Sequence, residues 1–568
     1  MRLLHPPIPP WLVPGPEGCR VVLLTRGVVP DAVFLRSLPD NEEALLPMQA
    51  AGHRGAWQAY EVLLPWDGGN PATRYAFKLL AGGTQHWLAA DGAHPRCPPE
   101  ALHFRVHPEA PPDWVREQVF YQVFPDRFAR AATTPHEPAW GAPLPPAQLQ
   151  QACYGGDLDG LIARLDHVQH AVGATAIYLN PVFSAGSNHR YDTEDYDHVD
   201  PRLGGDAALV RLREALSARG MRLVLDAVLN HTGARHPWRQ AQPHWYARDA
   251  QGAVQGWKGH AALPVLDFAE PALRAAVYEG PDAIVRRWLR PPYAIDGWRL
   301  DVIHMLGEGP GARHNEVHVR GIRRAIKQEN PQAYVLGEHF FEATRWLQGD
   351  QEDGAMNYHG FAQPLWAWLA GVDAAGHPIA LDAAGFDAWM ADARAATPYA
   401  QQLAQLNLLG SHDTPRLLTR LHGDLALMRL AFTLLFTLPG VPCLYYGDEV
   451  GMQGGADPDC RRCMDWSGQG WQHGLLDHVR TLAARRRARR EWREGAMQTL
   501  ASGADWLVFA RYTDRAATLV GVNRGAASEV EVALEGLPLT VPGWGTTLRL
   551  QLPARGGVVL CGEAAQAG

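Results

Sequence analysis

The chain has 568 residues, more than one compact core usually holds, so a large domain with one or two smaller ones is expected. Hydrophobic residues make up 46% and charged residues 20% of the sequence, a globular composition that excludes a disordered chain. The net charge of -8 disfavours a nucleic-acid partner, because phosphates require a basic surface.

Cysteine usage and hydropathy indicate a protein of a reducing compartment. The seven cysteines are an odd and sparse set, so no disulfide framework is expected and we predict a cytoplasmic protein. Cys460 and Cys463 form a lone C-x-x-C, interpreted as two structural or free thiols, with metal or redox use as the alternative. The most apolar window, 430–446, is broken by Pro439 and Pro442, so it predicts a buried helix followed by a strand and no membrane partner.

The first 110 residues have the pattern of a small β-domain. Short β-type runs at 20–25, 58–64 and 75–80 alternate with turns rich in glycine and proline. This predicts an N-terminal β-sandwich over residues 1–112, and its last residues, 108–112, form a proline-rich linker.

From Val115 the pattern changes to a repeated order of strand, loop and helix. Helices are predicted at 206–219, 271–289 and 317–329. Eight strands alternating with helices are typical of a (β/α)8 TIM barrel, here over residues 113–490, with a loop-rich insertion at 233–268 after the third strand. The predicted strands are 119–123, 175–179, 222–228, 297–302, 334–338, 356–358, 405–409 and 442–446.

The helical pattern ends after Arg490. The basic cluster at 485–490 is interpreted as the solvated end of a helix, where cations suit the helix dipole. Runs at 506–512, 517–522, 529–534 and 547–552 then predict a C-terminal antiparallel β-domain over residues 491–568.

Charged and polar side chains gather where the barrel strands end, and barrels carry their chemistry on that face. The third strand carries Asp226 and is followed by Asn230 and His231, the fourth carries Arg299 and Asp301, and the fifth ends in Glu338. The seventh is followed by His412 and Asp413, and the loop after the second contains His189 and Tyr191.

Two of these acids differ in their sequence surroundings. Arg299 and Asp301 lie two apart on a strand, so they point to the same side, and the arginine is expected to keep the aspartate ionised. Glu338 has no arginine beside it in the sequence, which favours it as a proton donor. Paired acids of this kind are typical of glycosidic chemistry, with a metal site or a structural Asp–Arg pair as the alternatives.

These segments resemble the α-amylase family of glycoside hydrolases. Residues 226–231, 297–301, 337–338 and 412–413 are similar to its four principal motifs, in order and at suitable spacing. The resemblance extends over nearly the whole chain, including both flanking β-domains.

The resemblance implies retaining hydrolysis of α-1,4-glucosidic bonds in maltodextrins without a cofactor. Asp301 would be the nucleophile, Glu338 the acid/base and Asp413 the stabiliser of the transition state. The other residues implied to bind substrate are Arg299, His231, His412, Asp226, Tyr191, His189 and, on the leaving-group side, His304.

The N-terminal β-domain narrows the resemblance to the neopullulanase and cyclomaltodextrinase branch. Residues 301–308 and 355–358 look most like the maltodextrin glucosidases, which implies glucose release from short maltodextrins. Cyclomaltodextrinase or neopullulanase action with transglycosylation is the alternative, and a silent sugar-binding or transporter-accessory homologue is a remote one, since all three acids are present. A homodimer is a further implication.

The sequence departs from many α-amylases at two places. His304-Met305 replaces a basic-His pair, so the leaving-group subsites are expected to differ. The loop 129–138 lacks the acidic and amide cluster that holds calcium in some relatives, and Asn230 has no evident partner ligands. We therefore predict no metal site.

Overall fold

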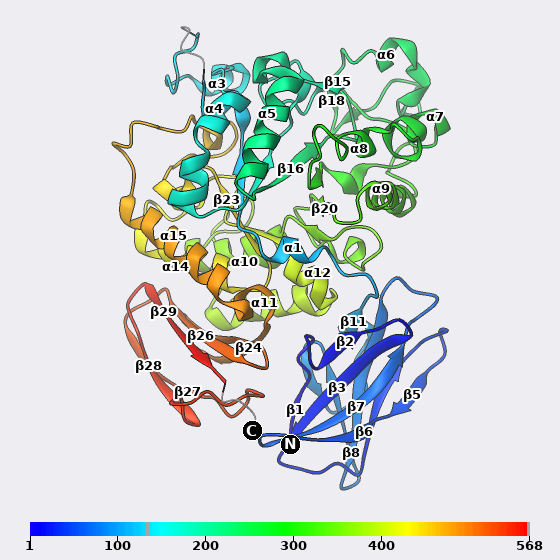
Figure 1. The fold of residues 1–568 in the computed structure, drawn as a ribbon, viewed down its shortest axis with the longest axis vertical. Helices are drawn as coiled ribbons and strands as arrows, with labels where there is room; N and C mark the ends of the chain where they lie inside the picture. Colours follow the sequence, from blue (N-terminus) through cyan, green and yellow to red (C-terminus); the bar gives the residue numbers. More distant parts are fainter. Residues whose placement is uncertain (132–135, 565–568) are drawn as a thin grey trace.

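The computed structural model describes residues 1–131 and 136–564, and its centre is a parallel sheet of eight strands (Figure 1). These are β12 (Phe120–Val123), β13 (Ala176–Leu179), β16 (Arg222–Ala227), β19 (Gly297–Leu300), β20 (Tyr334–Gly337), β21 (Gly354–Ala355), β22 (Leu406–Leu408) and β23 (Val441–Tyr445). They follow the order β21-β20-β19-β16-β13-β12-β23-β22, and a parallel bridge between Met356 and Leu406 joins its two ends. The predicted TIM barrel is confirmed.

The barrel strands are short apolar runs because helices cover the outside of the sheet. Every residue of β12, β13, β19 and β20 is buried. The longer helices around them are α5 (Gly205–Ala218), α9 (Asn315–Glu329), α11 (Ala383–Ala395), α14 (Leu425–Thr437) and α15 (His473–Ala488). In α9 the buried residues Val319, Ile322 and Ile326 recur at helical spacing, which seats one face of the helix on the barrel.

Shorter helices complete the barrel unit. They are α1 (Asp113–Arg116), α2 (Pro125–Phe128), α3 (Pro146–Gln151), α4 (Leu158–Ala163), α7 (Pro271–Arg274), α8 (Ile284–Arg287), α10 (Gln363–Leu365), α12 (Tyr399–Ala404), α13 (Leu417–Arg420) and α16 (Arg490–Glu494). The insertion at 233–268 contains α6 (Trp238–Ala241) and a hairpin of β17 (Gly256–Trp257) and β18 (His260–Pro264).

Two antiparallel sheets precede the barrel, as predicted. One contains β1 (Arg2–Leu4), β2 (Leu12–Pro14), β3 (Gly18–Arg26), β6 (Gln49–Arg54) and β7 (Trp57–Pro65). The other contains β4 (Ala32–Ser37), β5 (Ala44–Pro47), β8 (Thr73–Ala81), β9 (Thr84–Ala89), β10 (Gly92–His94) and β11 (Phe104–Val106). Side chains such as Leu23, Leu35 and Phe77 form one apolar cluster from both sheets.

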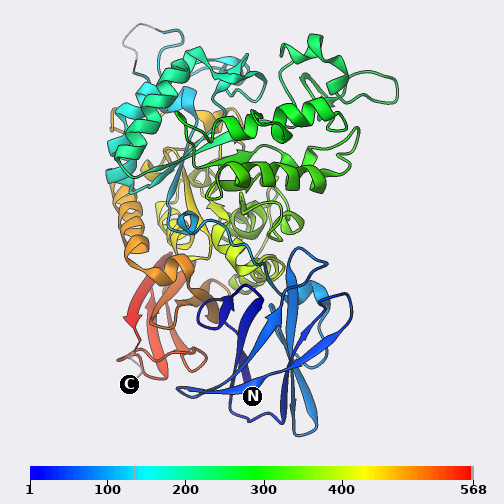
Figure 2. The same cartoon turned by 45° about the vertical axis from the view of Figure 1, so that its right-hand side comes forward.

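A third β-region follows the barrel, and it contacts the first. Its sheet is β24 (Ala496–Ser502), β25 (Trp506–Tyr512), β26 (Ala516–Asn523) and β29 (Gly556–Glu563), beside a hairpin of β27 (Ser528–Ala533) and β28 (Thr547–Leu552). Figures 1 and 2 place this sheet next to the N-terminal strands. Trp11 and Trp57 share an apolar cluster with Val508 and Leu519, and Nε1 of Trp57 donates to the Leu537 carbonyl at 3.0 Å.

Two expected elements differ from the structure, and two further strands were not expected. The sixth strand is β21, before the predicted 356–358, because the side chain of Asn357 accepts from the Gly360 N–H and begins a helical turn at Tyr358. The helix expected over 271–289 is interrupted, because the Gly280-Pro281 pair ends its first part. Strands β24 and β29 were not predicted.

Arg486 contradicts the interpretation of the basic cluster as a solvated helix end. Its side chain is fully buried in α15 and donates to the carbonyls of Phe436, Trp492, Gly440 and Arg116 at 2.7–3.1 Å. The helix end packs against the barrel and the last sheet, where these carbonyls need a donor.

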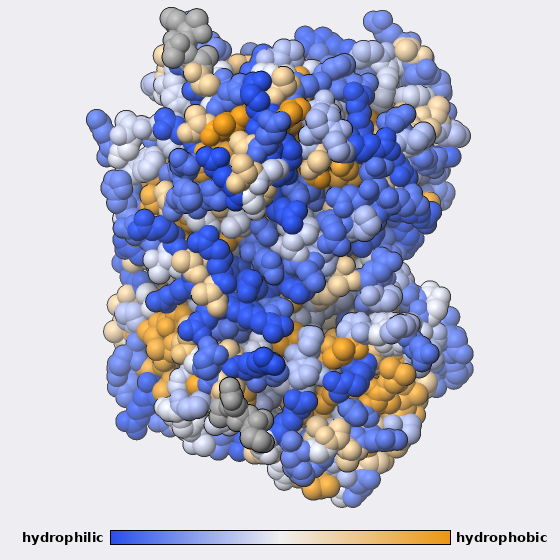
Figure 3. Space-filling model, in the orientation of Figure 1, coloured by the Kyte–Doolittle hydropathy of each residue, from blue (hydrophilic) through white to orange (hydrophobic). Residues whose placement is uncertain are grey.

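The surface is largely hydrophilic on the face shown in Figure 3, with small and separate apolar patches. No helix in the described ranges has the length and apolar character needed to span a membrane. All seven cysteines are free thiols.

Candidate active site

A pocket of about 800 Å³ opens at the carboxyl ends of the barrel strands. The hairpin of β17 and β18 supplies one wall, and the loops after β20 and β22 supply others. Seven of the ten predicted site residues line it: His189, Tyr191, His231, Asp301, His304, Glu338 and Asp413. The other three, Asp226, Arg299 and His412, are fully buried beside it.

Arg299 connects three of the carboxylates. Its Nη1 donates to Oδ1 of Asp226 at 2.9 Å and to Oδ1 of Asp301 at 2.8 Å, while Nη2 forms an ion pair with Oε1 of Glu338 at 2.6 Å. The sheet register causes this arrangement, since Asp226 pairs with Arg299 across β16 and β19, and β20 is the next strand. One guanidinium group therefore holds both members of the expected acid pair.

The expectation that Glu338 has no arginine beside it is wrong. Sequence neighbours do not show it, because Arg299 reaches Glu338 from the adjacent strand. A neighbouring arginine therefore does not explain why Asp301 and Glu338 would have different roles, because both acids contact Arg299.

The ionisation expected for Asp301 is also changed by burial. Burial and the neighbouring Glu338 carboxylate raise the pKa of Asp301 well above its usual value, and Arg299 opposes them. The contact with Arg299 favours the ionised form of Asp301.

Backbone strain orients Glu338. Val302 has φ 36° and ψ 39°, a left-handed conformation that is unfavourable for a β-branched residue. In this conformation its N–H donates to Oε2 of Glu338 at 2.8 Å. Strain of this kind concentrates at functional sites, where the surrounding structure maintains it.

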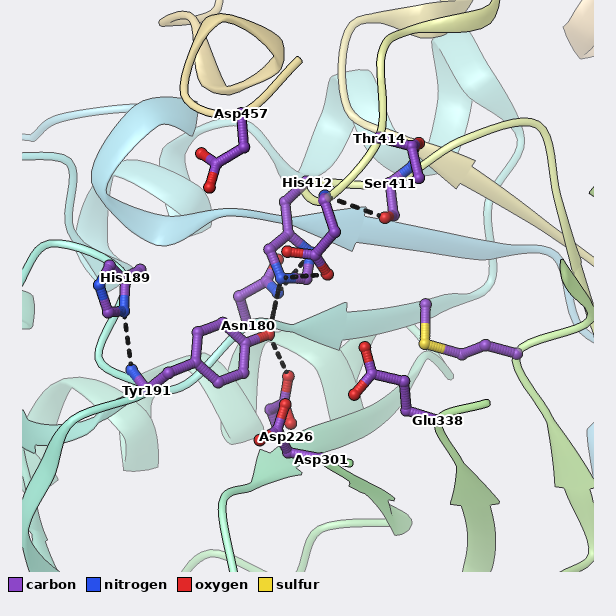
Figure 4. Close-up of polar contacts among 12 residues, drawn as sticks. Asn180, His189, Tyr191, Asp226, Asp301, Glu338, Ser411, His412, Thr414 and Asp457 are labelled. Carbon is purple, nitrogen blue, oxygen red and sulfur yellow. Dashed lines mark hydrogen bonds and ion pairs between the residues drawn. The ribbon is translucent and has the colours of Figure 1, made fainter. Parts of the chain in front are cut away.

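Asp413 lines the pocket from the loop after β22, next to His412, which Figure 4 shows. Its carboxylate contacts Nε2 of His412 at 3.0 Å and Nη2 of Arg461 at 3.1 Å. Burial lowers the pKa of His412 well below its usual value, so this imidazole is neutral near pH 7. The ring of Tyr191 stacks on His412 with centroids 5.5 Å apart.

Two tyrosines hold Asp226 beneath the pocket. The hydroxyls of Tyr178 and Tyr191 donate to its Oδ2 at 2.8 and 2.9 Å, and Figure 4 shows the Tyr191 contact. Burial raises the pKa of Asp226 to about 6, against the effect of Arg299.

Three pocket histidines are neutral polar groups. Burial lowers the pKa of His189, His231 and His304 to about 4 in each case. Neutral imidazoles donate and accept hydrogen bonds without adding charge, which suits contact with sugar hydroxyls.

Several pocket residues were not predicted. Arg461 and Asp457 lie in or near the C-x-x-C segment, which had been interpreted only through its thiols. Aromatic wall residues were missed as well, although Phe340 and Phe341 directly follow the Glu338-His339 pair and Trp257 lies in the predicted insertion.

The described residues contain no group of three His, Cys, Asp or Glu side chains that could hold a metal. Asn230, which resembles a calcium ligand, directs Nδ2 at Nδ1 of His231 at 3.2 Å. Residues 132–135 of the loop 129–138 lie outside the described ranges.

Comparisons with known proteins find similar proteins over most of the chain. The chain matches the family described as "Alpha amylase, catalytic domain" over residues 122–251 and 241–484. It is 35% identical over 501 residues to a cyclomaltodextrinase from Bacillus sp, covering 84% of this chain and 86% of that one. It is 33% identical over 465 residues to neopullulanase 2 from Thermoactinomyces vulgaris, covering 78% and 73%. A solved structure titled cyclomaltodextrinase matches with a TM-score of 0.74 at 28% identity, over 99% of each chain.

Proposed function

Because this chain belongs to the α-amylase family of glycoside hydrolases, we propose that it hydrolyses α-1,4-glucosidic bonds of short maltodextrins with retention of configuration. The observation that supports this most directly is the contact of Arg299 with both Asp301 and Glu338. Because one guanidinium contacts both carboxylates, they lie close together. Retaining enzymes in general hold their two carboxyl groups about 5 Å apart.

In the proposed reaction Asp301 attacks the anomeric carbon while Glu338 protonates the departing glycosidic oxygen. Glu338 then removes a proton from water, which attacks the glycosyl-enzyme and releases Asp301. Asp413 stabilises the positive charge that develops on the sugar ring. Arg299 holds Asp301 and Glu338 in place. Proton NMR of the first product tests the stereochemistry, and initial release of the β-anomer contradicts the proposal.

Product specificity has two candidates. Residues 301–308 and 355–358 support glucose release from linear maltodextrins, whereas the 35% identity to a cyclomaltodextrinase supports the opening of cyclic substrates. Chromatography of products from maltotriose, β-cyclodextrin and pullulan separates them. Glucose from maltotriose with poor use of the other two supports the first, and faster consumption of β-cyclodextrin supports the second.

Three further expectations stay proposals. The domain boundaries 1–112, 113–490 and 491–568 are supported by the three separate groups of sheets. Free cysteines support a cytoplasmic location. A homodimer is proposed from the family resemblance, and light scattering that gives about 62 kDa contradicts it.

A further inference from the structure

A buried His–Glu pair lies directly behind Glu338. Nε2 of His339 is 2.9 and 3.0 Å from the two carboxylate oxygens of Glu352, and both side chains are fully buried. Within the described part of the chain, Nδ1 of His339 has no hydrogen-bond partner, so Glu352 is the polar anchor of the ring.

The Glu352 carboxylate is pressed against the end of β20. A Cβ atom on Gly337 would lie 2.0 Å from Oε2 of Glu352, so only glycine leaves room for it. This contact is one residue before Glu338. The carboxylate therefore supports the backbone from which the proposed acid/base residue projects.

The imidazole is also fixed by its neighbours. Trp346 stacks on His339 with centroids 4.4 Å apart, and Nε1 of Trp346 donates to Oδ1 of Asn315 at 2.8 Å. The ring centroids of His304 and His339 are 5.5 Å apart. Nδ1 of His304 is 3.3 Å from the Glu338 carbonyl. Three groups thus fix the orientation of the residue after Glu338.

We infer that His339 and Glu352 are positioning residues for the proposed acid/base Glu338. Burying polar and ionisable groups costs desolvation energy, and an apolar pair of similar volume is often as stable. Stability therefore does not explain the pair, but its position does. Glu338 projects into the pocket, and the side chain of the next residue, His339, is anchored to Glu352. The inference rests on the proposed function, because it concerns the proton that Glu338 delivers.

Leaving-group dependence tests this role. Protonation matters greatly for a sugar leaving group and much less for fluoride, which departs readily without it. We expect Glu352→Gln to lower kcat/KM for maltotriose by about 10- to 100-fold, because small misplacements of a catalytic group have effects of this size. The value for α-maltosyl fluoride is expected to stay within about threefold of the wild type, since proton delivery contributes little there.

A matched control pair joins His167, before β13, to Glu449, after β23. Nε2 of His167 is 2.9 Å from Oε1 of the fully buried Glu449, and neither residue lines the pocket. Glu449→Gln is expected to lower thermal stability and to leave both kcat/KM values near wild type. Equal losses on the two substrates for Glu352→Gln, or no loss on either, overturn the positioning role.

Glu338→Gln separates this inference from the proposed function. If it retains wild-type activity on maltotriose, the proposed function fails. If it is inactive on maltotriose while Glu352→Gln matches the wild type, only the positioning role fails. Should Glu352→Gln not fold, the double variant His339→Gln/Glu352→Gln keeps a neutral hydrogen bond and is expected to show the same dependence on the leaving group.

Discussion

Nη2 of Arg299 lies 2.6 Å from Oε1 of Glu338, although the two residues come from different strands of the barrel. The same guanidinium donates to Asp226 and Asp301. Arg299 therefore sets the spacing of the acid pair and supplies one positive charge against three carboxylates.

Replacing Arg299 tests this arrangement. Arg299→Lys keeps the charge, but an ammonium group lacks the planar fork that contacts several carboxylates at once. We expect kcat/KM for maltotriose to fall at least about 100-fold. Arg213→Lys is the control, because Arg213 pairs with Asp296 just before β19, at the other end of the barrel. Similar activity in the two variants would contradict the central role of Arg299.

Removing either proposed catalytic acid should abolish turnover without unfolding the protein. We expect Asp301→Ala and Glu338→Gln to lose several orders of magnitude in kcat, with an unchanged circular dichroism spectrum. Asp296→Asn, at the base of the same strand, should keep most of the activity. Substantial turnover by Asp301→Ala would refute its assignment as nucleophile.

Acid sensitivity should arise partly from His5, far from the pocket. Burial lowers its pKa to about 4, from 6.5, while its nitrogens contact the Val22 carbonyl and the Tyr75 hydroxyl. Between these values only the unfolded chain binds the proton, so His5 destabilises the fold as the pH falls from 6.5 towards 4.

The His5→Asn variant checks this effect. Its melting temperature should depend less steeply on pH over that interval than that of the wild type. His53→Gln, in an exposed strand, serves as the control. Parallel profiles for wild type and His5→Asn would show that His5 does not contribute.

Arg486 should be essential for stability and its neighbour Arg485 should not. Arg486→Met leaves four buried carbonyls without this donor, so we expect a loss of at least about 3 kcal/mol in the free energy of unfolding. Arg485→Met, at an exposed position of α15, should change it by less than about 0.5 kcal/mol. Urea denaturation measures both, and equal effects would exclude the buried contacts as the cause.

A chelator should leave the enzyme active. The predicted absence of an essential metal leads us to expect the same kcat and melting temperature before and after dialysis against EDTA. An irreversible loss of activity that calcium prevents would show that the prediction is wrong.

The barrel could be predicted from the sequence because its strands are apolar runs with polar residues at their ends. Asp226, Asp301 and Glu338 lie at or near the ends of such runs, and this position predicted that they share one face of the barrel. The sixth strand was misplaced because Met356 and Tyr358 are apolar, although only Met356 makes a bridge there.

Contacts between strands could not be predicted in the same way. The ion pair of Arg299 with Glu338 depends on which strands are neighbours, and the burial that raises the pKa of Asp301 depends on the closed barrel. Arg461 reaches Asp413 from 48 positions away, and no local pattern indicates that contact.

The apolar cluster shared by Trp11, Trp57, Val508 and Leu519 has a consequence for synthesis. The ribosome synthesises Trp11 and Trp57 long before Val508 and Leu519. The apolar surface of the N-terminal strands is therefore exposed while the barrel is translated. We therefore expect chaperones to bind the nascent chain until late in translation. A chain truncated before residue 496 should keep this apolar surface exposed and aggregate.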